Sequence, residues 1–184
     1  NIRVEQLLTH RSGIVDIFAL DNFQELVQSN ATLEVLSKSL LEAGPEFEAG
    51  SRYQYSNGAY ALLAQIIEDL SGMSYQDFIQ QRIFAPLGMK NSGQDEKPNQ
   101  SSEMAKGYEP KGYQQRVESV ELPMNLLKGS GSLYSNVYEL SLWINSLKEK
   151  SLLSEASYQK FFKNYGNNYG LGISLYKLFD RKVF

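Results

Sequence analysis

Apolar residues are most concentrated between Ala59 and Leu70, directly after a polar, turn-rich entry. Three polar residues interrupt this segment, namely Gln65, Glu68 and Asp69. They leave one narrow polar stripe, so the pattern predicts a helix that is almost wholly buried. Ser56 or Asn57 would cap its start, because each carries a short side-chain oxygen that accepts from free backbone N–H groups. Gly72 stands where a left-handed C-terminal cap is expected.

Apolar residues spaced three and four apart predict further helices on both sides of this central one. The predicted helices are Val4–Thr9, Asp16–Gln28, and those that begin behind Thr32, Ser74, Asn136 and Ser154. Ser74 with Asp77, and Asn136 with Glu139, resemble capping boxes, in which each side chain bonds to the backbone N–H of the other residue.

Strand signals are fewer and shorter. Ala105–Tyr108 and Gln115–Val120 are predicted to pair as a hairpin around Pro110-Lys111-Gly112. Between Tyr169 and Leu175 large apolar residues alternate with small ones, which predicts a half-buried strand whose glycines let a neighbour lie close. Gly93–Ser102 is polar and is predicted to be a mobile surface loop. We therefore expect a mostly α structure with a few short β-strands.

Composition narrows the function classes. The 184 residues suit one domain or one large lobe with a core, and the net charge of -3 argues against a nucleic-acid partner. There are no cysteines, which excludes thiol catalysis, disulfides and Cys-based metal sites. No apolar run is long enough to span a bilayer, and no signal peptide is visible. Both ends look cut, so we expect residues 1–184 to be a single partial domain.

The sequence gives little reason to expect catalysis or metal binding by histidine. His10 is the only histidine, and no Gly-x-Ser-x-Gly elbow accompanies it, so a Ser-His-Asp enzyme is not indicated. At a helix end, His10 is interpreted as a helix cap or local hydrogen bonder. One histidine without a nearby carboxylate pair also gives no reason to expect a metal.

Tyr55 and Asn57 are the candidate chemical residues. A tyrosine acts as a general base only where its phenolate is stabilised, for example by an ammonium group, and a carboxamide two positions later can hold the amide of a substrate. Taken alone, the tripeptide is better explained as a packed tyrosine and a helix cap than as a catalytic pair.

Five short motifs give the tripeptide its context. In chain order they are Leu7-Leu8-Thr9-His10-Arg11-Ser12-Gly13-Ile14, Tyr55-Ser56-Asn57 followed by Tyr60-Ala61-Leu62-Leu63, Phe84-Ala85-Pro86-Leu87-Gly88-Met89, Gly129-Ser130-Gly131-Ser132-Leu133-Tyr134-Ser135, and Tyr169-Gly170-Leu171-Gly172. Together they resemble the beta-lactamase-related serine hydrolases, which include class C beta-lactamases, penicillin-binding D-alanyl-D-alanine peptidases and related esterases.

The resemblance implies a fold and a chemistry. The fold would be the helical lobe of the beta-lactamase/transpeptidase-like α+β fold. The chemistry would be acyl transfer to a serine, with hydrolysis of an amide, lactam or ester and without a cofactor. Carried over position by position, Tyr55 becomes the catalytic acid or base and Asn57 the substrate-binding amide. A small-molecule or peptide substrate and a periplasmic or secreted location are implied as well.

The chain departs from the family pattern in two places. The family's Ser-x-x-Lys lies upstream of the first motif, hence before Asn1, and its Lys-Thr-Gly or His-x-Gly motif is absent. Ser157-Tyr158-Gln159-Lys160 and Ser174-Leu175-Tyr176-Lys177 match Ser-x-x-Lys only by letters, because both follow Tyr55 in the wrong order. The 184 residues are therefore predicted not to turn over substrate.

Three interpretations stay open. The first is the helical lobe of a serine hydrolase, the second a non-catalytic binding paralogue on the same scaffold, and the third a plain helical interaction domain. Faces that would meet missing parts of the fold are expected to expose apolar side chains, so self-association is also predicted.

Overall fold

A computed structural model describes residues 1–95, 104–112, 115–119, 122–178 and 181–183. The helices are α1 (Val4–Leu8), α2 (Phe23–Gln28), α3 (Leu33–Ala43), α4 (Asn57–Ser71), α5 (Tyr75–Ile79), α6 (Ala85–Leu87), α7 (Val137–Glu149) and α8 (Glu155–Phe161). Short 3-10 turns cover Ile17–Ala19 and Met124–Leu127. The predicted fold class, mostly α with a few short strands, is confirmed. Among the described residues, no helix is long and apolar enough to cross a membrane.

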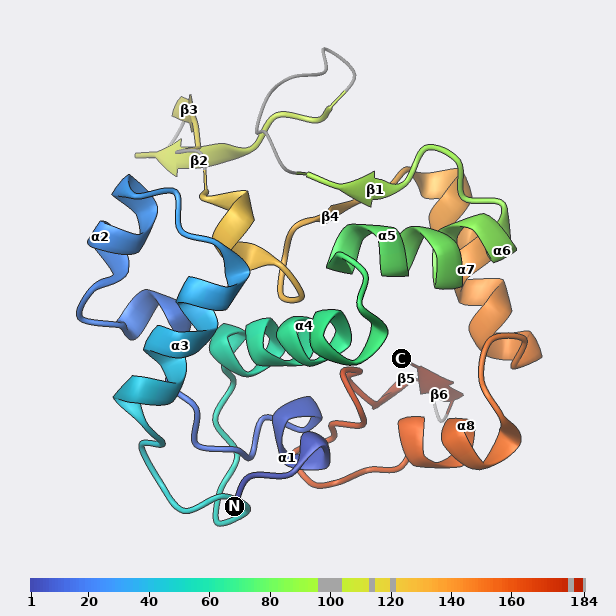
Figure 1. Cartoon of the computed structure of the whole chain (residues 1–184). Helices are drawn as coiled ribbons and strands as arrows, with labels where there is room; N and C mark the ends of the chain where they lie inside the picture. Colours follow the sequence, from blue (N-terminus) through green and yellow to red (C-terminus); the bar gives the residue numbers. More distant parts are fainter. Residues whose placement is uncertain (96–103, 113–114, 120–121, 179–180, 184) are drawn as a thin grey trace.

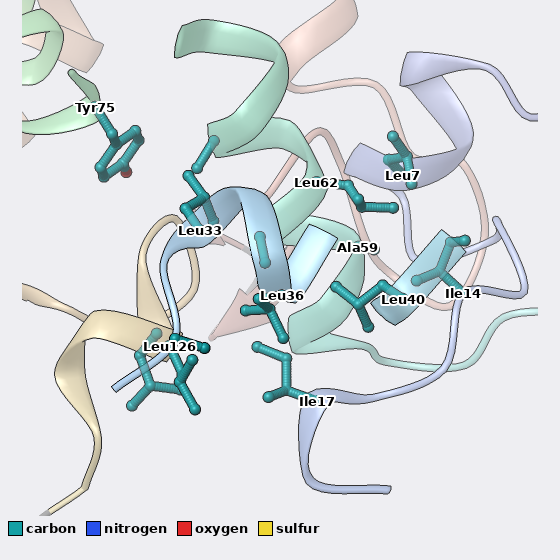
Figure 2. Packing of buried hydrophobic residues seen from close by; sticks show 14 of the residues in the cluster. Leu7, Ile14, Ile17, Leu33, Leu36, Leu40, Ala59, Leu62, Tyr75 and Leu126 are labelled. Carbon is teal, nitrogen blue, oxygen red and sulfur yellow. The ribbon is translucent and has the colours of Figure 1, made fainter. Parts of the chain in front are cut away.

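Helix α4 lies in the middle of the molecule, as the apolar pattern predicts (Figure 1). It contacts α1, α3 and α5. Ser56 is its N-cap, because its hydroxyl accepts from the Ala59 N–H over 3.0 Å, and Gly72 closes it at φ 67°. Residues from α3, α4 and the loop before α2 interlock in the core, with Leu36, Leu40 and Ala59 fully buried (Figure 2).

Burial of α4 is less complete than predicted. Its first half is buried at Ala59, Ala61 and Ala64, whereas Leu70 near its end is 85% exposed. The prediction of an almost wholly buried helix is therefore wrong for the last turn. An apolar sequence shows that a helix can be buried. How many of its turns are buried depends on the elements that pack against it.

The predicted helix Asp16–Gln28 is interrupted. The Asp16 carboxylate accepts from the Phe18 N–H and caps a single 3-10 turn, and Leu20 is then extended at ψ 132° before α2 begins at Phe23. An aspartate that bonds to a backbone N–H two residues on favours a turn over a continued helix. The predicted caps at Thr32, Ser74 and Ser154 are confirmed.

Helices α5 and α6 are joined by a π-helical segment, Gln80–Phe84. Pro86 has no N–H, so the Arg82 carbonyl lacks its usual partner four residues later, which favours a wider turn. Gly88 ends the run in the left-handed region at φ 72°.

The described strands form three separate antiparallel pairs. They are β1 (Gly93–Gln94) with β4 (Leu133–Tyr134), β2 (Tyr108–Lys111) with β3 (Gln115–Glu118), and β5 (Tyr176–Leu178) with β6 (Arg181–Val183). The predicted hairpin is confirmed, although its first strand begins at Tyr108 rather than ending there. The loop prediction is wrong for Gly93–Gln94, which pair with β4, while 96–102 of that loop and Val120 of the second strand lie outside the described residues.

The predicted strand from Tyr169 to Leu175 is instead a tight turn. Tyr169 and Ser174 form one bridge, and the Gly170 N–H donates to the Ile173 carbonyl over 2.7 Å. Gly172 has φ +78°, which reverses the chain where a strand would have continued. The expected close approach at the glycines is confirmed, since a Cβ at Gly172 would lie 2.8 Å from the Tyr60 hydroxyl.

Glu139 anchors α7 differently from the predicted capping box. Asn136 does cap α7, since its side chain accepts from the Glu139 N–H over 3.0 Å. The Glu139 carboxylate, however, accepts from the backbone and side-chain amides of Asn91 and from the Ser92 hydroxyl. Burial favours a higher pKa for Glu139, but these donors outweigh it and lower the pKa below its usual value. The glutamate thus ties α7 to the segment before β1.

Candidate functional site

Tyr55 and Asn57 lie together at the N-terminal end of α4. Asn57 is the first residue of the helix, and the Tyr55 hydroxyl donates to Asn57 Oδ1 over 3.4 Å. Tyr55 is 53% exposed, whereas Asn57 is partly buried. Because O–H···O bonds usually measure about 2.7–2.8 Å, the phenol is directed at the carboxamide without being held rigidly by it. One bound molecule can therefore reach both side chains from solvent.

Asp16 holds Asn57 from the other side. Its Oδ2 atom accepts from the Asn57 backbone N–H over 2.7 Å and from Asn57 Nδ2 over 2.9 Å. Its Oδ1 atom accepts from the Phe18 N–H over 3.0 Å. Hydrogen bonds to an ionised group are shorter and stronger than neutral ones, so this carboxylate is the firmest partner that Asn57 has.

The segments that carry Asp16 and Asn57 are fastened to each other. The Ser56 hydroxyl donates to the Val15 carbonyl over 3.1 Å while it caps α4. Gly58 lies against the same carbonyl, and a Cβ there would sit 2.3 Å from the Val15 oxygen. Only glycine allows this approach, which brings Asp16 within reach of the helix start.

The His10 ring packs against the Tyr55 ring. It is 1% exposed, and its ring centroid lies 4.2 Å from that of Tyr55. Its Nδ1 atom accepts from the Ser56 N–H over 3.2 Å, which requires the ring proton to be on Nε2, where it is donated to the Tyr169 hydroxyl over 3.1 Å. The neutral imidazole thus connects Tyr55-Ser56-Asn57 to the turn at Tyr169.

Burial keeps this imidazole neutral. It lowers the pKa of His10 to about 4, and the nearby Asp16 carboxylate offsets only part of the effect. A proton on Nδ1 would also remove the acceptor of the Ser56 N–H. The expectation that His10 is a helix cap or a local hydrogen bonder is wrong for its side chain, whose partners lie 46 and 159 residues away in the sequence.

Tyr60 packs on His10 in the interior, next to the site. The Tyr60 hydroxyl donates to the Leu8 carbonyl over 2.9 Å, and the Tyr60 ring lies 4.9 Å from that of His10. Burial, followed by the neighbouring Tyr169, raises the pKa of Tyr60 far above its usual value. Tyr60 therefore stays protonated and has a packing role, whereas Tyr55 is the phenol that reaches solvent.

The two Ser-x-x-Lys strings occupy ordinary structural positions. Ser157 lies in the first turn of α8, and its hydroxyl bonds to that of the cap residue Ser154 over 3.0 Å. Ser174 forms the bridge with Tyr169. Within the described ranges, no group of three or more His, Cys, Asp or Glu side chains is arranged to hold a metal ion.

Comparison with known proteins agrees with the fold and the motifs. The family model described as Beta-lactamase matches residues 1–174, and the chain belongs to this family. It is 30% identical over 179 residues to penicillin-binding protein 4* of Bacillus subtilis, an alignment that covers 88% of the chain and 39% of that protein. D-aminopeptidase of Brucella anthropi is 36% identical over 91 residues, covering 48% of the chain and 18% of that protein.

A solved structure shows the same fold. The penicillin-binding protein from Bacillus halodurans superposes with a TM-score of 0.80 at 23% identity, covering 99% of the chain and 58% of that protein. The chain thus spans about 40% of the length of its curated penicillin-binding relatives.

Proposed function

We propose that the chain is part of a serine hydrolase that transfers an acyl group to a serine and hydrolyses an amide, lactam or ester. The observation that carries the proposal is the pairing of Tyr55 with Asn57 at the open end of α4, in a chain of the beta-lactamase family. The pairing puts a phenol and a carboxamide at the start of a rigid core helix, where solvent reaches the phenol, and groups supported in this way are well placed for catalysis.

Each residue has a role in this proposal. Tyr55 carries a proton between the attacking serine and the leaving group, since a positioned acid or base contributes typically about 10²–10⁴-fold to a rate. Asn57 anchors the amide of the substrate beside the scissile carbonyl. The resemblance to a D-aminopeptidase and to penicillin-binding protein 4* supports peptides or amides of D-amino acids as substrates. The periplasmic or secreted location that the motif resemblance implies stays a part of this proposal.

The nucleophile lies outside the 184 residues in this proposal. Both internal Ser-x-x-Lys strings follow Tyr55, and Ser157 is engaged within α8. The test is to treat the purified 184-residue chain with a fluorescent beta-lactam and with an activated ester. We expect no stable label on the chain. A stable label mapped by peptide mass spectrometry to Ser157 or Ser174 would refute this assignment.

The same reagents test the parent activity. The protein extended by the residues encoded upstream of Asn1 should become labelled at a Ser-x-x-Lys serine. If the extended protein carries no such serine and binds the reagents without acylation, the proposal of a hydrolase is wrong and a non-catalytic binding paralogue takes its place.

A further inference from the structure

We propose that Asp16 is the positioning residue of this site: it sets which way the Asn57 carboxamide faces, and through Asn57 it directs the Tyr55 hydroxyl. The claim that this positioning serves catalysis rests on the proposed function, whereas the hydrogen bonds that position Asn57 do not depend on it.

The first step is the chemistry of the donors and acceptors. An ionised carboxylate only accepts hydrogen bonds, so the carboxamide atom that faces Asp16 has to be Nδ2. The Asn57 Nδ2 atom lies 2.9 Å from Asp16 Oδ2, and that orientation turns Asn57 Oδ1 toward the Tyr55 hydroxyl. Asn57 therefore offers an acceptor, rather than a donor, on the side of the phenol.

The second step compares the strength of the two contacts. The bond from Asn57 Nδ2 to Asp16 measures 2.9 Å and involves a charge, whereas the bond from the Tyr55 hydroxyl to Asn57 Oδ1 measures 3.4 Å and is neutral. Charge-assisted bonds are roughly twice as strong as neutral ones, so Asp16 decides the orientation and the phenol follows. A carboxamide polarised by a carboxylate is also a better acceptor at its oxygen, which strengthens the pull on the Tyr55 proton.

The third step is that Asp16 cannot easily turn away. The Asp16 Oδ1 atom accepts from the Phe18 N–H. The carbonyl of the preceding residue, Val15, accepts from the Ser56 hydroxyl and lies against Gly58. The Asp16 carboxylate is thus held by contacts outside the site, and the position of Asn57 follows from it. In the resting site the Tyr55 proton points at Asn57, which leaves the phenol oxygen free to accept a hydrogen bond from an incoming hydroxyl.

The test is NMR spectroscopy of the Asn57 side-chain amide in the 184-residue chain, with the resonances assigned by their loss in Asn57→Ala. We expect one Asn57 amide proton to be shifted downfield and to exchange slowly. In Asp16→Asn, which keeps the size but loses the charge, this shift should disappear while circular dichroism shows an intact fold. Asp21→Asn, an exposed aspartate of the same loop, should leave the shift unchanged.

An unchanged Asn57 resonance in folded Asp16→Asn would overturn the proposal. Should that variant fail to fold, hydrogen exchange in the unmutated chain decides instead. The Asn57 side-chain amide is expected to exchange more slowly than that of the exposed Asn30, and equally fast exchange overturns the inference. Because none of these readouts needs turnover, failure here is distinguishable from failure to form an acyl-enzyme.

Discussion

At the residue scale, the site depends on two side chains that hold the tripeptide without belonging to it. His10 accepts from the Ser56 N–H, and Asp16 accepts from both amides of Asn57. Neither role was predicted from the sequence, because the bonds span 46 and 41 residues and no local pattern carries such contacts. Tyr55 and Asn57 were found only because short motifs recur in a fixed order around them.

His10 predicts a specific dependence of stability on pH. Its pKa is about 4 when folded and about 6.5 when unfolded, so the unfolded chain binds the proton more tightly. The contribution is fully present above about pH 6.5 and is lost as the pH falls toward 4, by up to about 3 kcal/mol of unfolding free energy. Urea unfolding at a series of pH values measures it.

His10→Gln is the matched variant for this measurement. His10 is the only histidine, so between pH 6.5 and 5 the variant should show a flatter dependence than the unmutated chain. An equal slope in both proteins over that interval would show that the folded His10 takes up its proton normally.

At the element scale, capping chemistry was predictable and long-range packing was not. Ser56, Thr32 and Gly72 act as predicted because a cap involves only neighbours in the sequence. The segment after Tyr169 was mispredicted because its period-2 pattern suits a strand equally well, whereas the positive φ of Gly172 reverses the chain. Glu139 was mispredicted because its partners Asn91 and Ser92 belong to another element.

Gly58→Ala tests the packing of α4 against the Asp16 segment. In most helices alanine is the more stable residue, but here its Cβ would meet the Val15 oxygen and Leu40. We expect a loss of about 1–3 kcal/mol in unfolding free energy. Gly131→Ala, whose Cβ would make only ordinary contacts with Leu127, should change stability by less than about 0.5 kcal/mol. Equal effects in the two variants would show that the close approach at Gly58 is relieved without cost.

Glu139→Gln tests the attachment of α7. Loss of the charge weakens the bonds from Asn91 and Ser92, so we expect a lower melting temperature and faster hydrogen exchange at the Asn91 backbone amide. Glu149→Gln, at the exposed end of the same helix, should change neither. If exchange at Asn91 is the same in Glu139→Gln as in the unmutated chain, the anchor assigned to Glu139 is not needed.

At the scale of the whole molecule, an apolar surface runs along β4 and the start of α7. Its members, which we call the α7 patch, are between 37% and 81% exposed: Leu133, Tyr134, Val137, Tyr138 and Leu140. A largely apolar hollow of about 340 Å³ lies beside it. Exposed apolar side chains on neighbouring segments favour association, so we predict that the chain self-associates through the α7 patch.

Sedimentation velocity over a series of concentrations measures this association. The double variant Val137→Lys/Tyr138→Lys should shift the chain toward monomer, whereas Tyr108→Lys, an exposed tyrosine on β2, should not. A single monomeric species at every concentration would contradict the expectation.

The central claim is that Tyr55 and Asn57 act together in acyl transfer, and the rate of acylation tests it most directly. In the extended protein, where we propose that the serine nucleophile lies, a fluorescent beta-lactam or activated ester should acylate Tyr55→Phe about 10²–10⁴-fold more slowly and Asn57→Ala at least about tenfold more slowly. Tyr138→Phe, an exposed tyrosine outside the site, should react at the unmutated rate. Acylation of Tyr55→Phe and Asn57→Ala at the unmutated rate would contradict the account.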